Sequence, residues 1–431
     1  MTRHCPAMLV TAPASGQGKT TVCAALARYH RNQGRTVRVF KTGPDFLDPL
    51  MLTRASGAPV RQIDLWMVGR QESRRQLYQA AAEADLILIE GSMGLYDGVP
   101  SSADLAEAFG VPVCLLIDAS AMGQTFGAVA YGLAEYRADV TVAGVLANRV
   151  AGEGHTRLLR ESLPAGMTWF GALPRSPAAQ FPDRHLGLCQ PEEVDDLDGR
   201  LDEVAAAMGK TGAGALPPPV AFRPEPEVPT PGLLAGRRIG IARDEAFSFI
   251  YPANVDGLRA LGAEVTWFSP LHDEALPAVD AVWLPGGYPE LHLEALSRNH
   301  AMHRALAVHV AAERPLLAEC GGFLYLLEEL VDGEGHAAPM AGLLPGRAWM
   351  RPRLTALGLQ RADYPSGGLR GHTFHHSQAE VALTPWFHCE RLRGGKGEAV
   401  YRRGSVVAGY QHHYFPSSPE ATAELLGGPV Q

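Results

Sequence analysis

The stretch LVTAPASGQGKTT, residues 9–21, gives the first indication of the fold. An apolar run ends in small, turn-forming residues, and Gly18, Lys19 and Thr20 then open a helical pattern. This order is typical of a phosphate-binding loop, in which backbone N–H groups and the helix dipole attract a polyphosphate. Lys19 would add a positive charge and Thr20 a hydroxyl for Mg²⁺. The strict motif has glycine where this chain has Pro13, so a plain glycine-rich turn is the alternative.

Length and composition indicate a globular protein with more than one domain. A chain of 431 residues predicts about two or three domains. Its formal net charge is −8 without a long basic run, which disfavours nucleic-acid binding. No apolar stretch approaches the roughly 20 residues of a membrane span, so no membrane partner is expected.

The N-terminus and the cysteines predict a cytoplasmic location. The first expected strand follows the N-terminus directly, which leaves no room for a signal peptide. The six cysteines are scattered and include no C-x-x-C pair. That usage favours reduced thiols over a disulfide framework or a zinc knuckle.

The apolar pattern predicts two α/β domains, residues 1–210 and 237–431, joined by a proline-rich linker at 211–236. Continuous apolar runs in the first domain are typical of parallel strands buried on both faces, and residues 217–232 carry seven prolines. The strands expected in the first domain are 7–12, 36–41, 85–90, 112–118, 140–147 and 167–172, with helices at 19–33, 70–83, 102–109, 124–135 and 154–163. The strands expected in the second are 237–242, 263–268, 280–285 and 315–319, with helices at 252–261, 289–312 and 321–330, before a glycine-rich region of short strands.

Carboxylates follow successive strands of the first domain. Because ligands of a parallel sheet bind at the carboxyl ends of its strands, these groups are expected beside the phosphate loop. Asp45 and Glu90 are the candidates for Mg²⁺, together with Thr20. Asp48 and Asp97 lie further from the strand ends than Asp45 and Glu90, and they would position metal, substrate or water. For any single carboxylate, capping a turn or facing solvent is the alternative.

Two further residues belong to the same edge of the sheet. Lys41 ends the second strand and is a local basic group for an anionic substrate. Asn148 follows the fifth strand, where it would hydrogen-bond a nucleotide base or serve as an ordinary turn asparagine.

In the second domain Cys320 follows an apolar strand and precedes two glycines. Such a strand–turn–helix presents a nucleophile, and a helix N-terminus is expected to lower the thiol pKa. Backbone N–H groups of the Gly286–Gly287 turn and of Gly321 would form an oxyanion hole. The segment GYQHHYF at 409–415 offers two histidines as the base. A small buried cysteine in a helix turn is the alternative.

Three histidines, His372, His375 and His376, stand close together in the sequence. No cysteine or acidic residue stands near them at a familiar zinc spacing. A substrate-lining or hydrogen-bonded loop is therefore favoured over a metal site.

Taken together, these motifs resemble the cobyrinic acid a,c-diamide synthase family, the glutamine-dependent amidases of corrinoid (cobalamin) biosynthesis. The resemblance covers nearly the whole chain. The segments that carry it are SGQGKTT (15–21), KTGPDFLDP (41–49), EGSMGLYDG (90–98), residues 242–277, LPGGYPE (284–290), AECGGFLYL (318–326), RGHTFHHS (370–377) and GYQHHYF (409–415).

The resemblance implies a dethiobiotin synthetase-like P-loop domain followed by a class I glutamine amidotransferase-like domain. Cys320 would be the nucleophile and His412 its base. ATP, with Mg²⁺, would activate a carboxylate of a corrinoid polycarboxylate (cobyrinic or hydrogenobyrinic acid) as an acyl phosphate, and ammonia from L-glutamine would convert it to an amide. The residues expected to bind ATP are Ser15, Gly16, Gln17, Gly18, Lys19, Thr20, Thr21 and Asn148, while Lys41, Asp48 and Asp97 would serve substrate and phosphoryl transfer.

Two departures and several alternatives accompany the resemblance. Many class I glutaminases have a glutamate two residues after the base, where this chain has Tyr414, and many relatives read GHEFHYS where residues 371–377 read GHTFHHS. A cobyric acid synthase-like amidase, a nickel-tetrapyrrole a,c-diamide synthase and a partitioning-type P-loop ATPase are the alternative functions. The sequence leaves open the metal of the macrocycle, and a homodimer is a further possibility.

Overall fold

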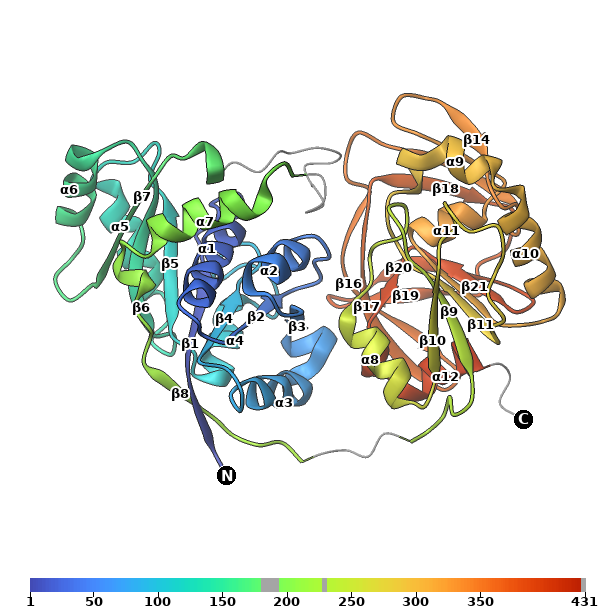
Figure 1. Ribbon diagram of the computed structural model, residues 1–431, viewed down its shortest axis with the longest axis horizontal. Helices are drawn as coiled ribbons and strands as arrows, with labels where there is room; N and C mark the ends of the chain where they lie inside the picture. Colours follow the sequence, from blue (N-terminus) through green and yellow to red (C-terminus); the bar gives the residue numbers. More distant parts are fainter. Residues whose placement is uncertain (180–193, 227–230, 428–431) are drawn as a thin grey trace. The chain divides into compact units, whose positions relative to one another are not determined.

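The computed structural model describes residues 1–179, 194–226 and 231–427 (Figure 1). The chain divides into two compact units, Met1–Glu227 and Val228–Gln431. In the described residues, no helix is both long and apolar enough to cross a membrane.

The first unit is built on a sheet in the order β3-β2-β4-β1-β5-β6-β7, whose neighbouring strands are parallel. All six strands predicted for this region are present. The strands are β1 (Arg3–Thr11), β2 (Val37–Thr42), β3 (Arg61–Ile63), β4 (Leu86–Glu90), β5 (Val113–Asp118), β6 (Val142–Val150) and β7 (Trp169–Pro174). The parallel P-loop sheet predicted from the sequence is confirmed.

Helices cover both faces of this sheet. One face packs against α1, α2 and α7 through residues such as Leu26, Leu52 and Leu201, and α7 lies beside α1 (Figure 1). The opposite face packs against α3 to α6. The helices are α1 (Lys19–Asn32), α2 (Asp48–Ser56), α3 (Arg70–Ala80), α4 (Ser102–Phe109), α5 (Thr125–Glu135), α6 (Glu153–Glu161) and α7 (Leu197–Met208), with the π-helical turn η1 (Leu65–Gly69) and the 3₁₀ turns η2 (Pro177–Ala179) and η5 (Gly212–Gly214).

The first unit extends beyond the predicted boundary at residue 210. Within the segment interpreted as a linker, β8 (Pro219–Phe222) pairs antiparallel with the start of β1, with Phe222 opposite Arg3. Prolines are tolerated here because β8 lies off the main strand order and pairs with β1 alone, as an edge strand on which a missing N–H is acceptable. Residues 211–222 therefore belong to the first unit, and the interpretation of 211–236 as linker throughout was wrong.

The second unit contains a sheet in the order β10-β9-β11-β12-β21-β20-β19-β16-β17-β22 and a small sheet in the order β14-β13-β15-β18. Its first strands, β10, β9, β11, β12 and β21, are parallel to one another. The strands are β9 (Arg238–Ala242), β10 (Glu264–Phe268), β11 (Ala281–Leu284), β12 (Leu316–Glu319), β13 (Glu329–Val331), β14 (Ala337–Pro339), β15 (Gly346–Met350), β16 (Ala356–Tyr364), β17 (Gly367–His375), β18 (Ser377–Val381), β19 (Phe387–Arg391), β20 (Lys396–Arg403), β21 (Val406–Gly409) and β22 (His412–His413).

The helices of the second unit also lie on both faces of its main sheet, with α9, α10 and α11 in one core and α8 and α12 in the other. The single helix predicted over 289–312 is broken, because Asn299 caps a new helix by accepting a hydrogen bond from Met302 N. The helices are α8 (Pro252–Ala260), η6 (Pro289–His292), α9 (Leu293–Arg298), α10 (His300–Ala311), α11 (Gly321–Leu326), η7 (Phe415–Ser417) and α12 (Pro419–Gly427).

Candidate active sites

The phosphate loop runs from the end of β1 into α1. Gly16 and Gly18 have φ of 77° and 93°, in the left-handed region that glycine adopts without strain. Lys19 is buried, and its Nζ donates a hydrogen bond to the carbonyl oxygen of Ala14 at 2.9 Å, which closes the loop on itself. Ser15 is exposed and Thr21 is half-buried in the first turn of α1. The loop has the geometry that the sequence predicted for a phosphate cradle.

Asn148 anchors this loop. Its Nδ2 donates to the carbonyl oxygen of Gln17 at 2.8 Å, while Gln17 Oε1 accepts from the backbone N of Asp118 at 2.8 Å. A Cβ on Gly18 would lie 2.6 Å from Asn148 Nδ2, a second reason for glycine at that position. The structure thus gives Asn148 a role in holding the loop, and its contact with a base stays a prediction.

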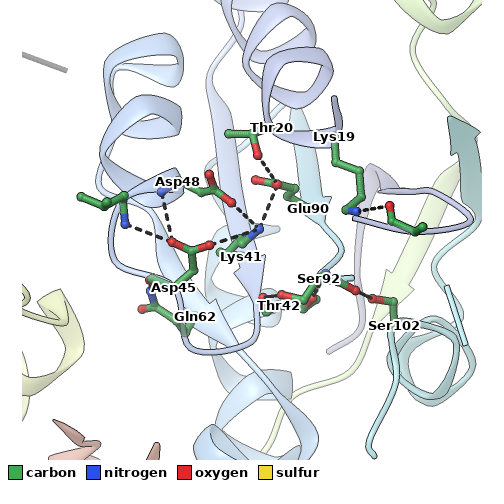
Figure 2. A network of polar contacts seen from close by, with 12 residues as sticks. Lys19, Thr20, Lys41, Thr42, Asp45, Asp48, Gln62, Glu90, Ser92 and Ser102 are labelled. Atoms are coloured by element: carbon green, nitrogen blue, oxygen red, sulfur yellow. Dashed lines mark hydrogen bonds and ion pairs between the residues drawn. The ribbon is translucent and has the colours of Figure 1, made fainter. Parts of the chain in front are cut away.

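Lys41 lies at the centre of a carboxylate cluster beside the loop (Figure 2). Its ammonium is 2.8 Å from Asp48 Oδ2, 2.9 Å from Glu90 Oε1 and 3.9 Å from Asp45 Oδ2. Thr20 Oγ1 donates to Glu90 Oε1 at 2.7 Å, which joins the phosphate loop to the end of β4. The structure therefore brings together five of the residues predicted from separate motifs. The predicted role of Lys41 toward an anionic substrate stays a prediction, since its ammonium contacts the protein's own carboxylates here.

The charges in this cluster shift one another's pKa. Burial alone would lower the pKa of Lys41, but Asp48, Glu90 and Asp45 raise it well above its ordinary value. Burial, with the neighbouring Asp48 charge, raises the pKa of Asp45 to about 8. Burial also raises the pKa of Glu90 against the opposing effect of Lys41, whereas Lys41 outweighs burial at Asp48 and lowers its pKa. Lys41 is thus charged, while the surroundings favour the protonated form of Asp45 and Glu90 and the ionised form of Asp48.

The donor set fits Mg²⁺ at Thr20 and Glu90. Glu90 Oε2 is buried and accepts no hydrogen bond, so it is an oxygen available to a cation. Asp45 is less suited, because its Oδ1 already accepts from the backbone N of Leu47 and Asp48. No group of three histidine, cysteine or acidic side chains in the described part of the chain forms a ready metal site, so waters and phosphate oxygens would complete the coordination.

Asp97 also lies near the loop. Burial lowers the pKa of Lys19, and the negative charge of Asp97 partly opposes that lowering. Asp97 Oδ2 also accepts a hydrogen bond from Gly94 N at 2.9 Å. Nearby, Ser92 N donates to Thr42 Oγ1 at 2.7 Å and Ser92 Oγ donates to the Thr42 carbonyl oxygen, which ties the ends of β2 and β4 together (Figure 2). Sequence reasoning missed Thr42 and Ser92, whose only signal was their place at strand ends.

In the second unit, Cys320 stands on the strand–turn–helix that its glycines predicted. The residue has φ 44° and ψ −107°, and its backbone N donates to the carbonyl oxygen of Gly409 at 2.8 Å. A Cβ on Gly322 would lie 2.2 Å from the Leu284 carbonyl oxygen, so the helix can pack this closely only with glycine. A cysteine held with positive φ is strained, and such strain is concentrated at functional sites.

The predicted oxyanion donors and the predicted base lie around this turn. The N–H of Gly321 hydrogen-bonds the Cys320 thiol, and a Cβ on Gly321 would lie 2.8 Å from Gly287 N. A Cβ on Gly286 would lie 2.3 Å from His412 Cε1. Residues predicted from three separate motifs therefore converge on one place.

The thiol pKa is shifted opposite to the expectation. Burial, reinforced by the charge of Glu290, raises the pKa of Cys320 well above its ordinary value, and the Gly321 hydrogen bond lowers it only in part. The expectation of a lowered thiol pKa was wrong.

His412 is enclosed by other histidines. Burial, followed by the positive forms of His372, His413 and His375, lowers the pKa of His412 well below its usual value. The His372 ring stacks on it, with centroids 4.8 Å apart, and His372 Nδ1 lies 3.1 Å from Tyr251 Oη. His412 is therefore held neutral, the state in which an imidazole acts as a base.

The histidine-rich segment forms part of β17. His375 stacks on Tyr410 at 3.6 Å, its Nδ1 lies 2.9 Å from the Ser377 carbonyl oxygen, and its Nε2 lies 3.3 Å from Glu398 Oε1. The hydrogen-bonded interpretation holds for His372 and His375, although in a strand instead of a loop. His372, which contacts the base directly, is a site residue whose place the sequence left open.

Two family models match this chain, each over one unit. Residues 8–188 match the CobQ/CobB/MinD/ParA nucleotide binding domain, and residues 238–420 match the CobB/CobQ-like glutamine amidotransferase domain. The chain is 59% identical to the hydrogenobyrinate a,c-diamide synthase of Stutzerimonas stutzeri over 98% of this chain and 99% of that protein. It belongs to the a,c-diamide synthase family.

Other members of this family are similar over the same span. The hydrogenobyrinate a,c-diamide synthase of Pseudomonas aeruginosa is 58% identical, with 98% of both chains covered. The cobyrinate a,c-diamide synthase of Herminiimonas arsenicoxydans is 47% identical over 98% of this chain and 97% of that one. The resemblance inferred from the motifs is thus confirmed, and the family relationship extends through both units.

Proposed function

We propose that this protein converts the a and c side-chain carboxylates of a corrin-ring polycarboxylate into amides, using ATP and glutamine. The observation that carries the proposal is full-length similarity to a,c-diamide synthases, with a phosphate loop in one unit and a cysteine turn in the other. The relatives at 59% and 58% identity are named for hydrogenobyrinate and the one at 47% for cobyrinate, so the metal-free acid is our proposed substrate.

In the second unit, glutamine would be hydrolysed at Cys320. The raised pKa of Cys320 and the lowered pKa of His412 both favour a neutral thiol–imidazole pair. The thiol proton would therefore pass to His412 as the sulfur attacks the side-chain amide carbon. The Gly287 and Gly321 N–H groups would hold the oxyanion, and the amide nitrogen would leave as ammonia after taking that proton. Water would then release glutamate from the thioester.

In the first unit, the γ-phosphate of ATP would pass to a substrate carboxylate. The phosphate loop and Lys19 would hold the polyphosphate, and Asn148 would keep the loop in shape. Thr20 and Glu90 would hold Mg²⁺, which offsets phosphate charge when bound. Ammonia would displace phosphate from the acyl phosphate to leave the amide.

The alternatives are weaker on specific grounds. A partitioning-type ATPase has no use for the amidotransferase unit, which the family model matches over residues 238–420. A cobyric acid synthase-like or nickel-tetrapyrrole enzyme would share both units, but the relatives described above are named for hydrogenobyrinate and cobyrinate. A cytoplasmic location and a homodimer stay predictions, the latter to be checked by light scattering.

Product analysis tests the proposal directly. Hydrogenobyrinic and cobyrinic acids are each incubated with ATP, Mg²⁺ and glutamine, and the products are examined by mass spectrometry. We expect two successive replacements of carboxyl OH by NH₂ on hydrogenobyrinic acid, and their loss in Cys320→Ser unless ammonium is supplied. No amidation of either acid, or glutamine-dependent amidation by Cys320→Ser, would refute the assignment.

A further inference from the structure

A buried carboxylate next to the nucleophile connects two segments of the second unit. Glu319 is the last residue of β12, precedes Cys320 and is 1% exposed. Its Oε1 accepts from His413 N at 3.0 Å and from His413 Nδ1 at 2.6 Å, and its Oε2 accepts from Trp283 Nε1 at 3.1 Å. Both oxygens are therefore fixed by donors on other elements.

His413 is held on its far side as well. Its Nε2 lies 3.0 Å from Tyr364 Oη, and its carbonyl oxygen accepts from Asn254 Nδ2 at 2.8 Å. With Nδ1–H donating to Glu319, Nε2 accepts from the Tyr364 hydroxyl. The ring is thus fixed at both nitrogens and cannot rotate without breaking a buried hydrogen bond, which is costly in such surroundings.

The two ends of this contact stand beside the two reacting groups. Glu319 adjoins Cys320 in sequence, and His413 adjoins His412. The backbone of β12 pairs with β11 and β21, whereas β22 pairs with β17 on a distant part of the sheet order. The strand that carries the nucleophile and the strand that carries the base are therefore not paired with each other. The Glu319–His413 hydrogen bonds connect them directly.

We propose that Glu319, acting through His413, is the positioning carboxylate that sets the place of His412 relative to Cys320. The proposal rests on the glutaminase activity proposed above. Tyr414, two residues after His412, has no carboxylate to offer, and its ring packs edge-on against Tyr251 in the core. The orienting carboxylate comes instead from the strand that carries the nucleophile.

Shortening the side chain of Glu319 tests whether the position of its carboxylate matters, since the charge is kept. Glu319→Asp keeps the negative charge but withdraws it by one carbon–carbon bond, about 1.5 Å. A misplacement of about 1 Å in an active site costs about a hundredfold in rate. We expect the kcat for glutamine hydrolysis to fall about a hundredfold with little change in KM, because both Glu319 oxygens are occupied by donors from His413 and Trp283.

The test compares three variants with a matched control, all in the full chain. Glutamine hydrolysis is measured for Glu319→Asp, His413→Asn and His413→Leu. Ammonium-driven amidation, which does not need glutamine hydrolysis, shows whether the rest of each variant is still folded and active. Asparagine supplies a donor near the place of Nδ1, so His413→Asn retains more kcat than His413→Leu. Cys389→Ala removes packing from the same core as Trp283 and Tyr364, and it lowers the melting temperature without lowering kcat.

Each outcome bears on one of the two proposals. Loss of kcat in Glu319→Asp, partial rescue by His413→Asn and intact ammonium activity support positioning. A wild-type kcat in Glu319→Asp and His413→Leu overturns it, as does an equal loss of both activities in all three variants, which would assign the network to folding. Absence of glutamine hydrolysis in the unaltered protein, or its persistence in Cys320→Ser, refutes the proposed function instead.

Discussion

Replacing Gly286 by alanine tests how closely the backbone of the oxyanion turn approaches the base. A Cβ at this position would lie 2.3 Å from His412 Cε1, 3.0 Å from His412 Nδ1 and 3.2 Å from Phe249 Cδ2. Gly286 does not have a left-handed φ, so alanine adds no backbone strain of its own. The change therefore acts on the base through contact alone.

The size of the effect follows from the overlap. Two carbon atoms in contact settle at about 3.5 Å or more, so a 2.3 Å approach requires a shift of about 1.2 Å. Part of this shift falls on the His412 ring, which the stacked His372 confines on another side. A displacement of about 1 Å predicts a loss of about a hundredfold in kcat for glutamine hydrolysis, or about 2.7 kcal/mol in activation free energy.

Steady-state glutamine hydrolysis measures the loss, and ammonium-driven amidation shows whether the first unit still works. Gly333→Ala is the matched control, because a Cβ there meets nothing within 4 Å and its φ lies outside the left-handed region. We expect the control to behave like the unaltered protein. If Gly286→Ala hydrolysed glutamine at the normal rate, the contact between this turn and His412 would not govern the reaction.

Three further predictions follow from the burial and charge of the two sites. Lys41→Met leaves the buried Glu90 and the partly buried Asp48 without their cation. This loss should destabilise the protein by about 3–5 kcal/mol and lower its urea midpoint, and an unchanged midpoint would contradict the buried Lys41–Glu90 ion pair. Because the pKa of Cys320 is raised by burial and by Glu290, its alkylation by iodoacetamide should be slow at neutral pH and still increase above pH 9, and a plateau below pH 8 would show a lowered pKa instead. Glu90→Gln should strongly reduce ammonium-driven amidation and raise the Mg²⁺ concentration that the remaining activity requires, while glutamine hydrolysis continues. An unaltered Mg²⁺ dependence would show that Glu90 does not bind the metal.

Much of the fold could be predicted from local sequence. The central strands β4 and β5 were readable because each is an almost continuous apolar run, and the glycine turns marked where strands ended. The helix α2 was missed because its start lies within an acidic segment, where Asp45 and Asp48 suggested chemistry instead of the helix start they also form. The same residues belong to the candidate site and to the start of α2, and the apolar periodicity of the sequence does not distinguish the two roles.

At the two sites, the sequence did not predict the pKa values of the side chains or the contacts between residues far apart in the chain. A cysteine before two glycines predicted the turn at Cys320, but its pKa depends on burial and on Glu290, which lies thirty residues earlier in the chain. The pairing of Glu319 with His413 likewise joins residues 94 positions apart. Sequence spacing shows what kinds of groups are present, whereas their partners arise only when distant strands come together.

The pairing of β8 with β1 has a consequence for the order in which the chain assembles. Residues 3–6, among the first to be synthesised, find their partner only at residues 219–222. A contact of such long sequence separation is slow to form, since a large loop must close first. A first domain cut at residue 210 would leave that part of β1 as an open edge, available to pair with another molecule. The separated domain should therefore be expressed through Phe222, and on the ribosome its sheet is completed only as the second unit begins to be made.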